Sequence, residues 1–490
     1  MTATTSTAQG IAFNFENSYA RLPEVFFRRV APQPLRGAFL ASVNADALAL
    51  LDLPPEAANA PEFLEFFSGA KLLAGAEPIA AAYAGHQFGV YVPQLGDGRA
   101  ILLGEAVNQS GGRWDLQLKG AGLTPFSRMG DGRAVLRSCI REYLCSEAMH
   151  GLGIPTTRAL CLIGSDEPVR RETSEKGAAM VRMSPSHVRF GSFEYFYYRN
   201  QPEQVRQLAD YTIALHFPDL LETPQPYAAF FQEVVTRTAR LMAQWQAVGF
   251  AHGVMNTDNM SLLGLTLDYG PFGFLDEYDA GYICNHSDHT GRYAFGGQPQ
   301  IGFWNLACLA QALSPVVPES AAIDGLNSYQ ATLSQHYLAL MCAKLGLSEV
   351  RAADFDLIVP LLETLQTNRV DYTRFFRALC RFEVNHNDEL RDMFINSSDF
   401  DAWAALYQKR LEAGDDDAER QTRMQRVNPK YILRNYLAQN AITRAEAGDY
   451  EEIERLLKLL RHPFAEQPEQ EVYAALPPAW SKHLEISCSS

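Results

Sequence analysis

The sequence predicts an α+β fold in which a strand-rich part is followed by a longer helical part. Strand signals and most glycine-rich loops lie between about residues 76 and 195, and helical patterns prevail after them. The 490 residues, 47% of them hydrophobic, suffice for one large domain with additions or for two to three ordinary domains. We divide the chain into an N-terminal extension (1–75), a strand-rich unit (76–195), a helical unit (196–345) and a helical C-terminal extension (346–490).

The composition favours a soluble cytoplasmic protein. A net charge of -15 argues against a general nucleic-acid binder, whose surface would be basic. Residues 1–10 contain no Lys or Arg and lack the apolar stretch of a signal peptide. No apolar run approaches the roughly 18 residues that span a bilayer. We therefore expect neither a membrane nor a nucleic-acid partner.

Two glycines near the start of the strand-rich unit predict a tight turn. Residues 89–92 and 100–103 flank Gly96-Asp97-Gly98-Arg99, a pattern typical of a hairpin with an Asp-Gly turn. The turn is either an ordinary hairpin or a phosphate-binding loop, since backbone N–H groups of glycine can approach phosphate oxygens closely.

The next strand, residues 114–119, alternates strictly between apolar and polar side chains. Trp114, Leu116 and Leu118 face one way, so Lys119 lies on the opposite, polar face and can point into a cleft. A helix is predicted over residues 133–150, whose apolar residues form one stripe.

Asp131, followed by Gly132, is expected to cap that helix at its N-terminus. Glu142 lies mid-helix and could pair with Lys119. The alternative is a solvated strand lysine and a surface glutamate, because single residues are weak signals.

The most informative segment is residues 252–259 (HGVMNTDN), followed by Asp268. A protein-kinase catalytic loop reads His-x-Asp-x-x-x-x-Asn, where the Asp is the base and the Asn a metal ligand. Aligned on His252, the pattern places Asn259 on the Asn but Val254 on the base. A carboxylate occurs instead at Asp258. Asn259 and Asp268 supply hard oxygen ligands for magnesium or manganese.

The order of these parts predicts a protein-kinase-like two-lobed fold. A glycine turn, a strand lysine, a helix glutamate and a set of Asp and Asn residues follow one another as they do in kinases. Residues 76–195 would form the β-rich N-lobe. Residues 196–345 would form the helical C-lobe, with the catalytic loop and activation segment.

Two further features have both a functional and an ordinary interpretation. Arg182 and Arg189 could clamp a phosphate by forked hydrogen bonds, or could be surface arginines. His286 and His289, with Asp288 between them, could hold zinc. No third strong ligand lies nearby in sequence, so an activation-segment loop is the favoured interpretation of residues 285–289.

The chain resembles the selenoprotein O family from about residue 10 to its C-terminus. The segments that carry the resemblance are residues 85–89 (GHQFG), 94–99 (QLGDGR), 115–122 (DLQLKGAG), 124–128 (TPFSR), 252–259 (HGVMNTDN) and 268–272 (DYGPF). The resemblance implies a kinase-like fold that binds ATP in a flipped orientation with Mg²⁺ or Mn²⁺. It also implies transfer of AMP, with release of pyrophosphate, to Ser, Thr or Tyr hydroxyls of proteins, including the chain itself.

The resemblance also implies roles for individual residues. Asp258 matches the base, Asn259 and Asp268 match the metal ligands, and Glu142 matches the partner of the lysine. The residues that match phosphate-holding side chains are Lys119, Arg182 and Arg189. The residues that match further nucleotide contacts are Gly96, Gly98, Arg99, Asp131 and Gly132.

Three other functions stay open at this point. A conventional kinase is weakened by Val254. Transfer of UMP from UTP with manganese is linked to some family members. A catalytically dead nucleotide-binding scaffold would have no need to retain Asp258, Asn259 and Asp268 together.

The eight cysteines include no Cys-x-x-Cys pair, which disfavours a zinc ribbon. Animal members of the family carry selenocysteine near the C-terminus, where this chain has Cys488. We expect Cys488 to be a reactive thiol and Cys284, in the activation-segment region, to be its disulfide partner.

Overall fold

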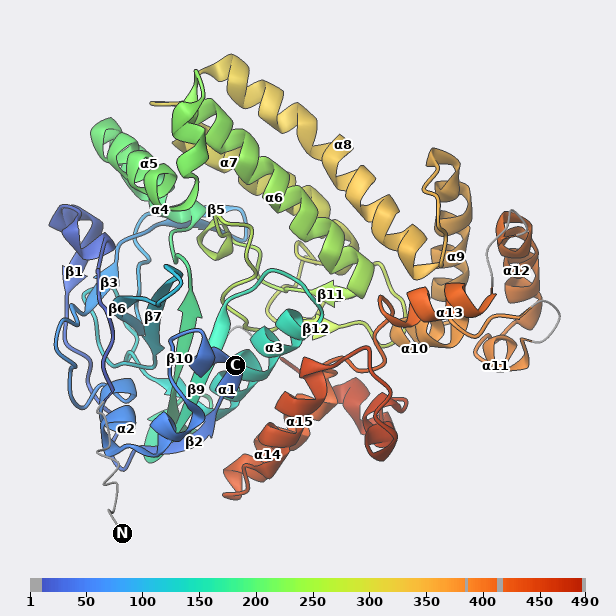
Figure 1. Ribbon diagram of the computed structural model, residues 1–490, viewed down its shortest axis with the longest axis horizontal. Helices are drawn as coiled ribbons and strands as arrows, with labels where there is room; N and C mark the ends of the chain where they lie inside the picture. The colour runs from blue at the N-terminus through green and yellow to red at the C-terminus, as the bar shows by residue number, and fades with distance from the viewer. Residues whose placement is uncertain (1–10, 384–386, 412–416, 487–490) are drawn as a thin grey trace, which may run out of the picture.

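The computed structural model describes residues 11–383, 387–411 and 417–486, and it contains one large antiparallel sheet (Figure 1). The strands follow the order β1-β3-β6-β7-β10-β9-β2, and β8 pairs with β10. Their bounds are β1 Phe27–Arg29, β2 Phe39–Val43, β3 Ile79–Ala81, β6 Ala100–Val107, β7 Arg113–Lys119, β8 Ala134–Val135, β9 Arg158–Arg170 and β10 Ser174–Ser184.

The alternation predicted for residues 114–119 is confirmed in β7, but both faces of the strand are buried. Leu116 and Leu118 share a core with Leu48 and Phe63 of the short helices α1 (Ala45–Ala49) and α2 (Pro61–Phe67). On the other face, Lys119 is only 6% exposed. A buried lysine needs a partner, so this face of the sheet is an interior polar surface.

Helix α3 (Leu136–Gly151) covers the polar face of the sheet. It packs on β9 and β10, and on its other side lie α14 (Asn435–Glu446) and α15 (Glu451–Arg461) (Figure 1). A helix buried between two layers has apolar residues around most of its circumference, and here even Glu142 is only 1% exposed.

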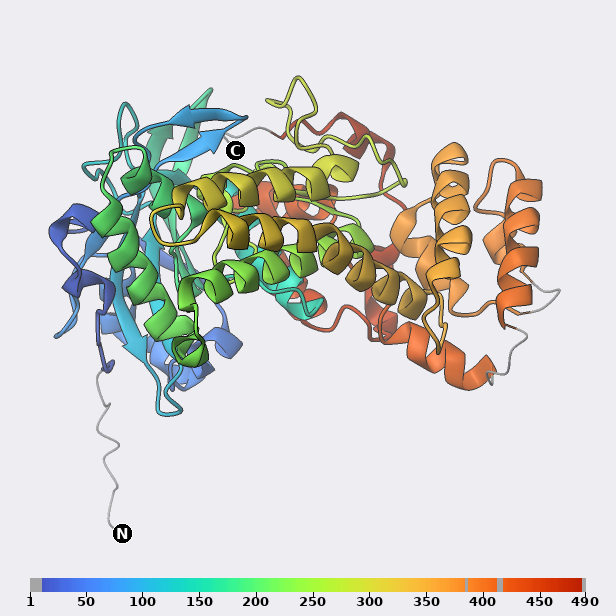
Figure 2. The same cartoon turned by 90° about the horizontal axis from the view of Figure 1, so that it is seen from above.

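The rest of the chain is mainly helical, and its helices α9 to α13 lie far from the sheet (Figure 2). Helices α6 and α8 run side by side along their length, and α9 to α13 surround a second core. The bounds are α4 Phe190–Tyr197, α5 Pro202–His216, α6 Pro226–Val248, α7 Gln298–Ala312, α8 Glu319–Lys344, α9 Phe355–Thr367, α10 Tyr372–Leu379, α11 Asp388–Arg391, α12 Ser397–Leu411 and α13 Asp417–Gln425.

Two small sheets hold the loops between these parts. Strand β11 (Phe250–Ala251) pairs with β12 (Gly273–Phe274) around residues 252–272. Strand β4 (Gly85–Gln87) pairs with β5 (Val90–Val92).

The predicted hairpin around Gly96-Asp97-Gly98-Arg99 is wrong. Strand β5 pairs with β4, whereas β6 pairs with β3 and β7. The turn instead joins two sheets, and the Asp97 carboxylate accepts a hydrogen bond from the backbone N–H of Ala81 at 2.9 Å.

The predicted N-cap is also wrong. Helix α3 begins at Leu136 after β8, and Val135 occupies the cap position. Asp131 instead accepts from the backbone N–H of Arg133 and pairs with Arg171 at 2.8 Å. The two residues of β8 add to the sheet between the Asp-Gly turn and the helix, which moves the start of the helix beyond the reach of Asp131.

Within the residues that the structure describes, no helix is both long enough and apolar enough to cross a membrane.

Candidate nucleotide and metal site

A buried network of ion pairs joins β7, α3, β10 and the loop after residues 252–259. These residues are called the catalytic segment below, after the kinase loop that they resemble. The Lys119 ammonium donates to Glu142, and Arg182 donates to the other oxygen of Glu142 at 3.0 Å. Arg182 also donates to Oδ1 of Asp268, and Arg189 donates to its Oδ2 at 2.5 Å. These five side chains, predicted from separate parts of the sequence, therefore form one continuous cluster.

The cluster has more positive than negative charge, because three cations face two carboxylates. Burial opposes ionisation of Asp268, but the charges of Arg182, Arg189 and Lys119 outweigh burial and hold its pKa well below the usual range. Asp268 also has a left-handed backbone, with φ of 59°. A non-glycine residue is held there only where its surroundings compensate, and the two arginines do so.

Gln117, a residue that the sequence analysis missed, supports Arg182. Gln117 accepts from the Arg182 Nε at 2.6 Å and donates to Asp97 at 3.3 Å. Burial raises the pKa of Asp97, although the charge of Arg189 opposes the shift. The position of Gln117 on the same strand face as Lys119 was the available signal, but a glutamine carries no motif that singles it out.

The catalytic segment follows β11 and is fixed at both ends. The His252 ring bonds to the Leu267 carbonyl at 2.9 Å, and the Asn259 amide donates to the Val254 carbonyl at 2.9 Å. Val254, half-buried, occupies the place of a kinase base. The Asn259 amide nitrogen is engaged with backbone, which leaves its Oδ1 as the atom that can meet a cation.

Asp258 lies in a one-turn helix, Thr257–Asn259, and is 7% exposed. Its Oδ2 accepts from the Gln87 amide at 3.1 Å, while its buried Oδ1 has no described partner. Burial raises the pKa of Asp258 to about 7, and the Gln87 hydrogen bond and the Arg189 charge limit the rise. A carboxyl with such a pKa can gain and lose a proton near neutral pH.

Strand β4 runs directly over this segment. The backbone N–H of His86 donates to the Thr257 hydroxyl at 2.7 Å, and that of Phe88 donates to Asn256 at 3.2 Å. A side chain at position 85 would clash with Asp258, since a Cβ there would lie 2.5 Å from Oδ1. The glycine therefore lets the strand approach the carboxylate closely.

The donor set of Asn259 and Asp268 fits a hard divalent cation, because both offer oxygen and Asp268 is held ionised. A cation at Asp268 competes with Arg182 and Arg189 for the same carboxylate oxygens. If a metal binds together with phosphates, Arg182 and Arg189 can bond to the phosphates, and the Asp268 oxygens are then available to the metal.

The remaining predicted nucleotide contacts lie around the loop between β7 and β8. Arg99 is half-buried next to the lysine strand, where its carbonyl accepts from the N–H of Gly120 at 2.7 Å. Gly98 is tied to the loop by the Ser127 hydroxyl. Gly96 and Gly132 both have positive φ, and a Cβ on Gly132 would lie 2.0 Å from the Gly122 carbonyl oxygen. The exposed carboxylate of Asp131 lies at the outer end of this loop, paired with Arg171.

The zinc alternative at residues 285–289 finds no geometric support. The Asp288 carboxylate accepts from the backbone N–H groups of Arg292 and Tyr293, at 3.0 and 2.7 Å, and so orders the loop. Over the described ranges, the only three potential ligands of this kind that converge are His86, Glu194 and Cys308.

Only one of the two predicted redox cysteines, Cys284, lies in the part of the chain that the structure describes. Cys284 is 7% exposed and lies near the Ala251 carbonyl, at the start of the catalytic segment. Cys488 lies outside the described residues. The last described residues do approach this region, because the N–H of His286 donates to the Ile486 carbonyl at 2.7 Å.

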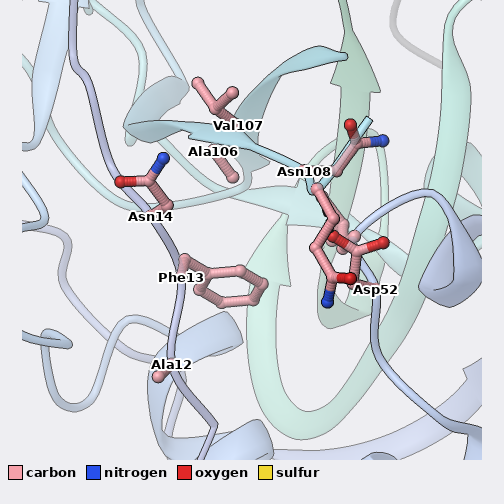
Figure 3. Close-up of a pocket in the computed structure, with 9 residues that line it drawn as sticks. Ala12, Phe13, Asn14, Asp52, Ala106, Val107 and Asn108 are labelled. Carbon is pink, nitrogen blue, oxygen red and sulfur yellow. Dashed lines mark hydrogen bonds between the residues drawn. The ribbon is translucent and has the colours of Figure 1, made fainter. Parts of the chain in front are cut away.

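A surface pocket of about 310 Å³ lies elsewhere (Figure 3). It is lined by residues near the N-terminus and the end of β6, such as Phe13, Asp52 and Asn108, and contains none of the predicted site residues.

A cation-rich cluster near candidate oxygen ligands and a near-neutral carboxyl is typical of enzymes that transfer a phosphorus-containing group. A family model described as protein adenylyltransferase SelO matches residues 9–461. The chain therefore belongs to the SelO family, and it is a nucleotidyltransferase.

Curated relatives named protein nucleotidyltransferase YdiU match over nearly their full length. The protein of Myxococcus xanthus is 60% identical over 480 residues, covering 97% of this chain and 98% of the relative. That of Thioalkalivibrio sulfidiphilus is 58% identical over 484 residues, covering 97% and 98%. That of Thiobacillus denitrificans is 57% identical over 488 residues, covering 98% and 99%.

The ion-pair network yields a prediction about Glu142. Glu142→Gln removes the shared anion from Lys119 and Arg182, so we expect it to lower both the thermal midpoint and the affinity for ATP. Loss of one partner of a buried pair costs on the order of 3 kcal/mol. Differential scanning calorimetry and ATP titration measure the two effects.

Glu147→Gln is the matched control, because Glu147 lies on the same helix and pairs with buried Arg158 at 2.8 Å. It is expected to lower the thermal midpoint alone. Equal losses of ATP affinity in the two variants would contradict the assignment of Glu142 to the site.

Proposed function

We propose that the protein transfers AMP from ATP to hydroxyl groups of proteins, with ATP bound so that its α-phosphate faces Asp258. The observation that carries the proposal is the loop itself. Val254 removes the base of a kinase, while Asp258, beside the ligand Asn259, is a buried carboxyl with a pKa of about 7. The family description of adenylyl transfer supports the same reaction.

The proposal includes a kinase-like arrangement of the chain. The sheet with α3, in residues 76–195, corresponds to an N-lobe, and residues 196–345 correspond to a C-lobe with the catalytic loop and the activation segment. Residues 1–75 and 346–490 are extensions of this core. A cytoplasmic location agrees with the composition and stays a prediction.

Each residue of the site has a defined task in this reaction. The excess positive charge of Lys119, Arg182 and Arg189 stabilises the triphosphate and the departing pyrophosphate. Glu142 holds Lys119 and Arg182 in place. The oxygen of the acceptor hydroxyl attacks the α-phosphorus, and the bond from this phosphorus to pyrophosphate breaks. Asp258 accepts the proton that the hydroxyl loses.

Asn259 and Asp268 would hold Mg²⁺ or Mn²⁺, which when bound neutralises charge on the phosphates. Gly96, Gly98, Arg99, Asp131 and Gly132 remain proposed nucleotide contacts. Protein acceptors include Ser, Thr and Tyr hydroxyls and the chain itself. UMP transfer from UTP uses the same residues, because none of the described contacts selects the base.

Labelled ATP separates adenylyl transfer from phosphotransfer. With ATP labelled at the α-phosphate, we expect label on protein acceptors, and with γ-labelled ATP we expect none. Asp268→Ala should lower incorporation at least about 100-fold, because one metal ligand and the charge partner of two arginines are lost. Transfer of γ-label would establish a kinase instead.

The pH dependence tests the role of Asp258. Its carboxyl must be deprotonated to accept a proton, so the rate should rise with pH through about 7, the value that burial gives its pKa. Asp258→Asn should lower the rate by about 10²- to 10⁴-fold and remove the rise.

Asp115→Asn is the matched control, since burial also raises the pKa of Asp115 to about 7. Asp115 lies outside the proposed reaction path, so the rise should persist in this variant. A rise that survives in Asp258→Asn would assign the proton transfer to another group.

A disulfide between Cys284 and Cys488 remains a proposal, supported by the bond between His286 and Ile486. Mass spectrometry of a non-reduced digest, prepared under oxidising conditions, should find the two cysteines linked, and Cys308→Ser should leave the link intact. Both thiols free under these conditions would rule the disulfide out.

A further inference from the structure

Arg292 is a half-buried cation beside the catalytic segment that makes no ion pair with a carboxylate of residues 11–383, 387–411 or 417–486. Its guanidinium stacks on the Trp304 ring of α7, 4.6 Å from the ring centre. On the other side it meets the tip of the β4–β5 hairpin, where a Cβ on Gly89 would lie 3.2 Å from its Cζ. A glycine at the tip thus leaves room for the guanidinium.

Arg292 is connected to the proposed base through two short paths. The next residue, Tyr293, donates from its hydroxyl to Asn256 at 2.6 Å and accepts from the backbone N–H of Phe88 at 2.9 Å. Gln87, two residues from Gly89, donates to Asp258 at 3.1 Å. Arg292 therefore stands at the edge of the same small region as the carboxylate that receives the acceptor proton.

The carboxylate nearest to Arg292 in sequence does not neutralise it. Both oxygens of Asp288 accept from backbone, Oδ1 from the N–H of Arg292 itself and Oδ2 from that of Tyr293. Among the residues that the structure describes, the guanidinium therefore has the Trp304 ring as a stacking partner and no carboxylate within ion-pair distance. Stacking on an aromatic face leaves the planar N–H edge of an arginine available for a carboxylate.

Two exposed apolar side chains flank Gly89 at the tip of the hairpin. Phe88, whose N–H donates to Asn256, is 38% exposed, and Val90 is 68% exposed. Phe88 also has a left-handed backbone, with φ of 50°. A half-buried cation beside exposed apolar side chains, close to the proposed base, suits an extended peptide that carries an acidic residue near the modified one.

We propose that Arg292 is a specificity-determining residue, which binds an Asp or Glu side chain close to the acceptor hydroxyl of the protein substrate. The proposal rests on the proposed adenylyl transfer and adds a class of acceptor to it, a hydroxyl flanked by acidic and apolar residues. The chain has 57 acidic and 42 basic residues, so its overall charge repels acidic peptides. An arginine that pairs with no carboxylate of the described residues attracts an acidic side chain at that one position and so selects where the peptide binds.

The test uses the full-length protein, α-labelled ATP and two synthetic peptide series. Each series holds one Tyr, Ser or Thr, and the residues within three positions of it are Glu in one series and Gln in the other. We expect kcat/KM to be about tenfold higher for the best Glu peptide, the size expected of one hydrogen-bonded charge pair. The difference should lie mainly in KM, because the contact is made to the substrate before and during transfer.

Variants separate recognition from a structural role of the arginine. Arg292→Gln should bring the ratio of kcat/KM for Glu and Gln peptides close to one. Arg292→Glu should make a third series, with Lys at the same positions, the preferred substrate. Arg240→Gln, on an exposed position of α6 where Arg240 meets His336, is the control and should keep the wild-type ratio. A purely structural role would lower the rate on all peptides by the same factor.

The outcomes also distinguish this inference from the reaction on which it rests. If wild-type protein labels Glu and Gln peptides equally, the role of Arg292 is refuted while adenylyl transfer stands. If a protein acceptor is labelled but no peptide of either series is, recognition of a short acidic segment is likewise refuted. If the α-label reaches no acceptor at all, the proposed function itself fails. A wild-type preference for Glu peptides is assigned to Arg292 when Arg292→Gln or Arg292→Glu removes it, so instability of one variant leaves the other for the test.

Discussion

The ion pairs that hold Asp268 between Arg182 and Arg189 are the constraint on which the rest of the site depends. They connect the large sheet, the entry to α4 and the loop that follows the catalytic segment. Because buried charges are costly unless they are paired, each of these parts is positioned relative to the others. The three cations and two carboxylates of the cluster leave one positive charge in excess, in a chain whose net charge is -15. A polyphosphate is the natural counter-charge for such a cluster.

The catalytic segment separates two sides with different chemistry. On one side lie the cations and the oxygens proposed to bind a metal, and on the other lies the β4–β5 hairpin, held to residues 256–258 by three hydrogen bonds. Asp258 lies between them, with one oxygen bonded to Gln87 and the other without a described partner. The replacement of a kinase base by Val254 is then compatible with a reaction at a different phosphate, served by a carboxylate four residues later.

The sequence predicted the ionic core because the order and spacing of its parts match those of a kinase, although each part alone is a weak signal. The alternation of residues 114–119 placed Lys119 on a polar face, and the predicted helix placed Glu142 near its middle, where it could pair with Lys119. The pattern could not show that this polar face is buried. A strand alternates in the same way whether its polar side chains face solvent or face polar groups of a second layer of protein. The family resemblance, confirmed over residues 9–461, supplied roles that spacing alone does not.

The errors have definite physical causes. The Asp-Gly turn was assigned to a hairpin because two strand-like segments flank it. Strand pairing is set by tertiary packing, however, and β5 pairs with β4. Asp131 was assigned to a cap because the two-residue strand β8 is too short to predict. Gln87, Gln117 and Arg292 were missed as site residues because a single polar side chain gains its meaning only from the neighbours that the fold brings to it.

The orientation of the nucleotide is the central claim, and a crystal structure with Mn²⁺ and an ATP analogue that cannot be cleaved between the α- and β-phosphorus tests it directly. The account predicts anomalous signal from manganese between Asn259 and Asp268, with the α-phosphorus as the phosphorus nearest to Asp258. A γ-phosphorus nearest to Asp258, with the adenine placed as in a kinase, would contradict it.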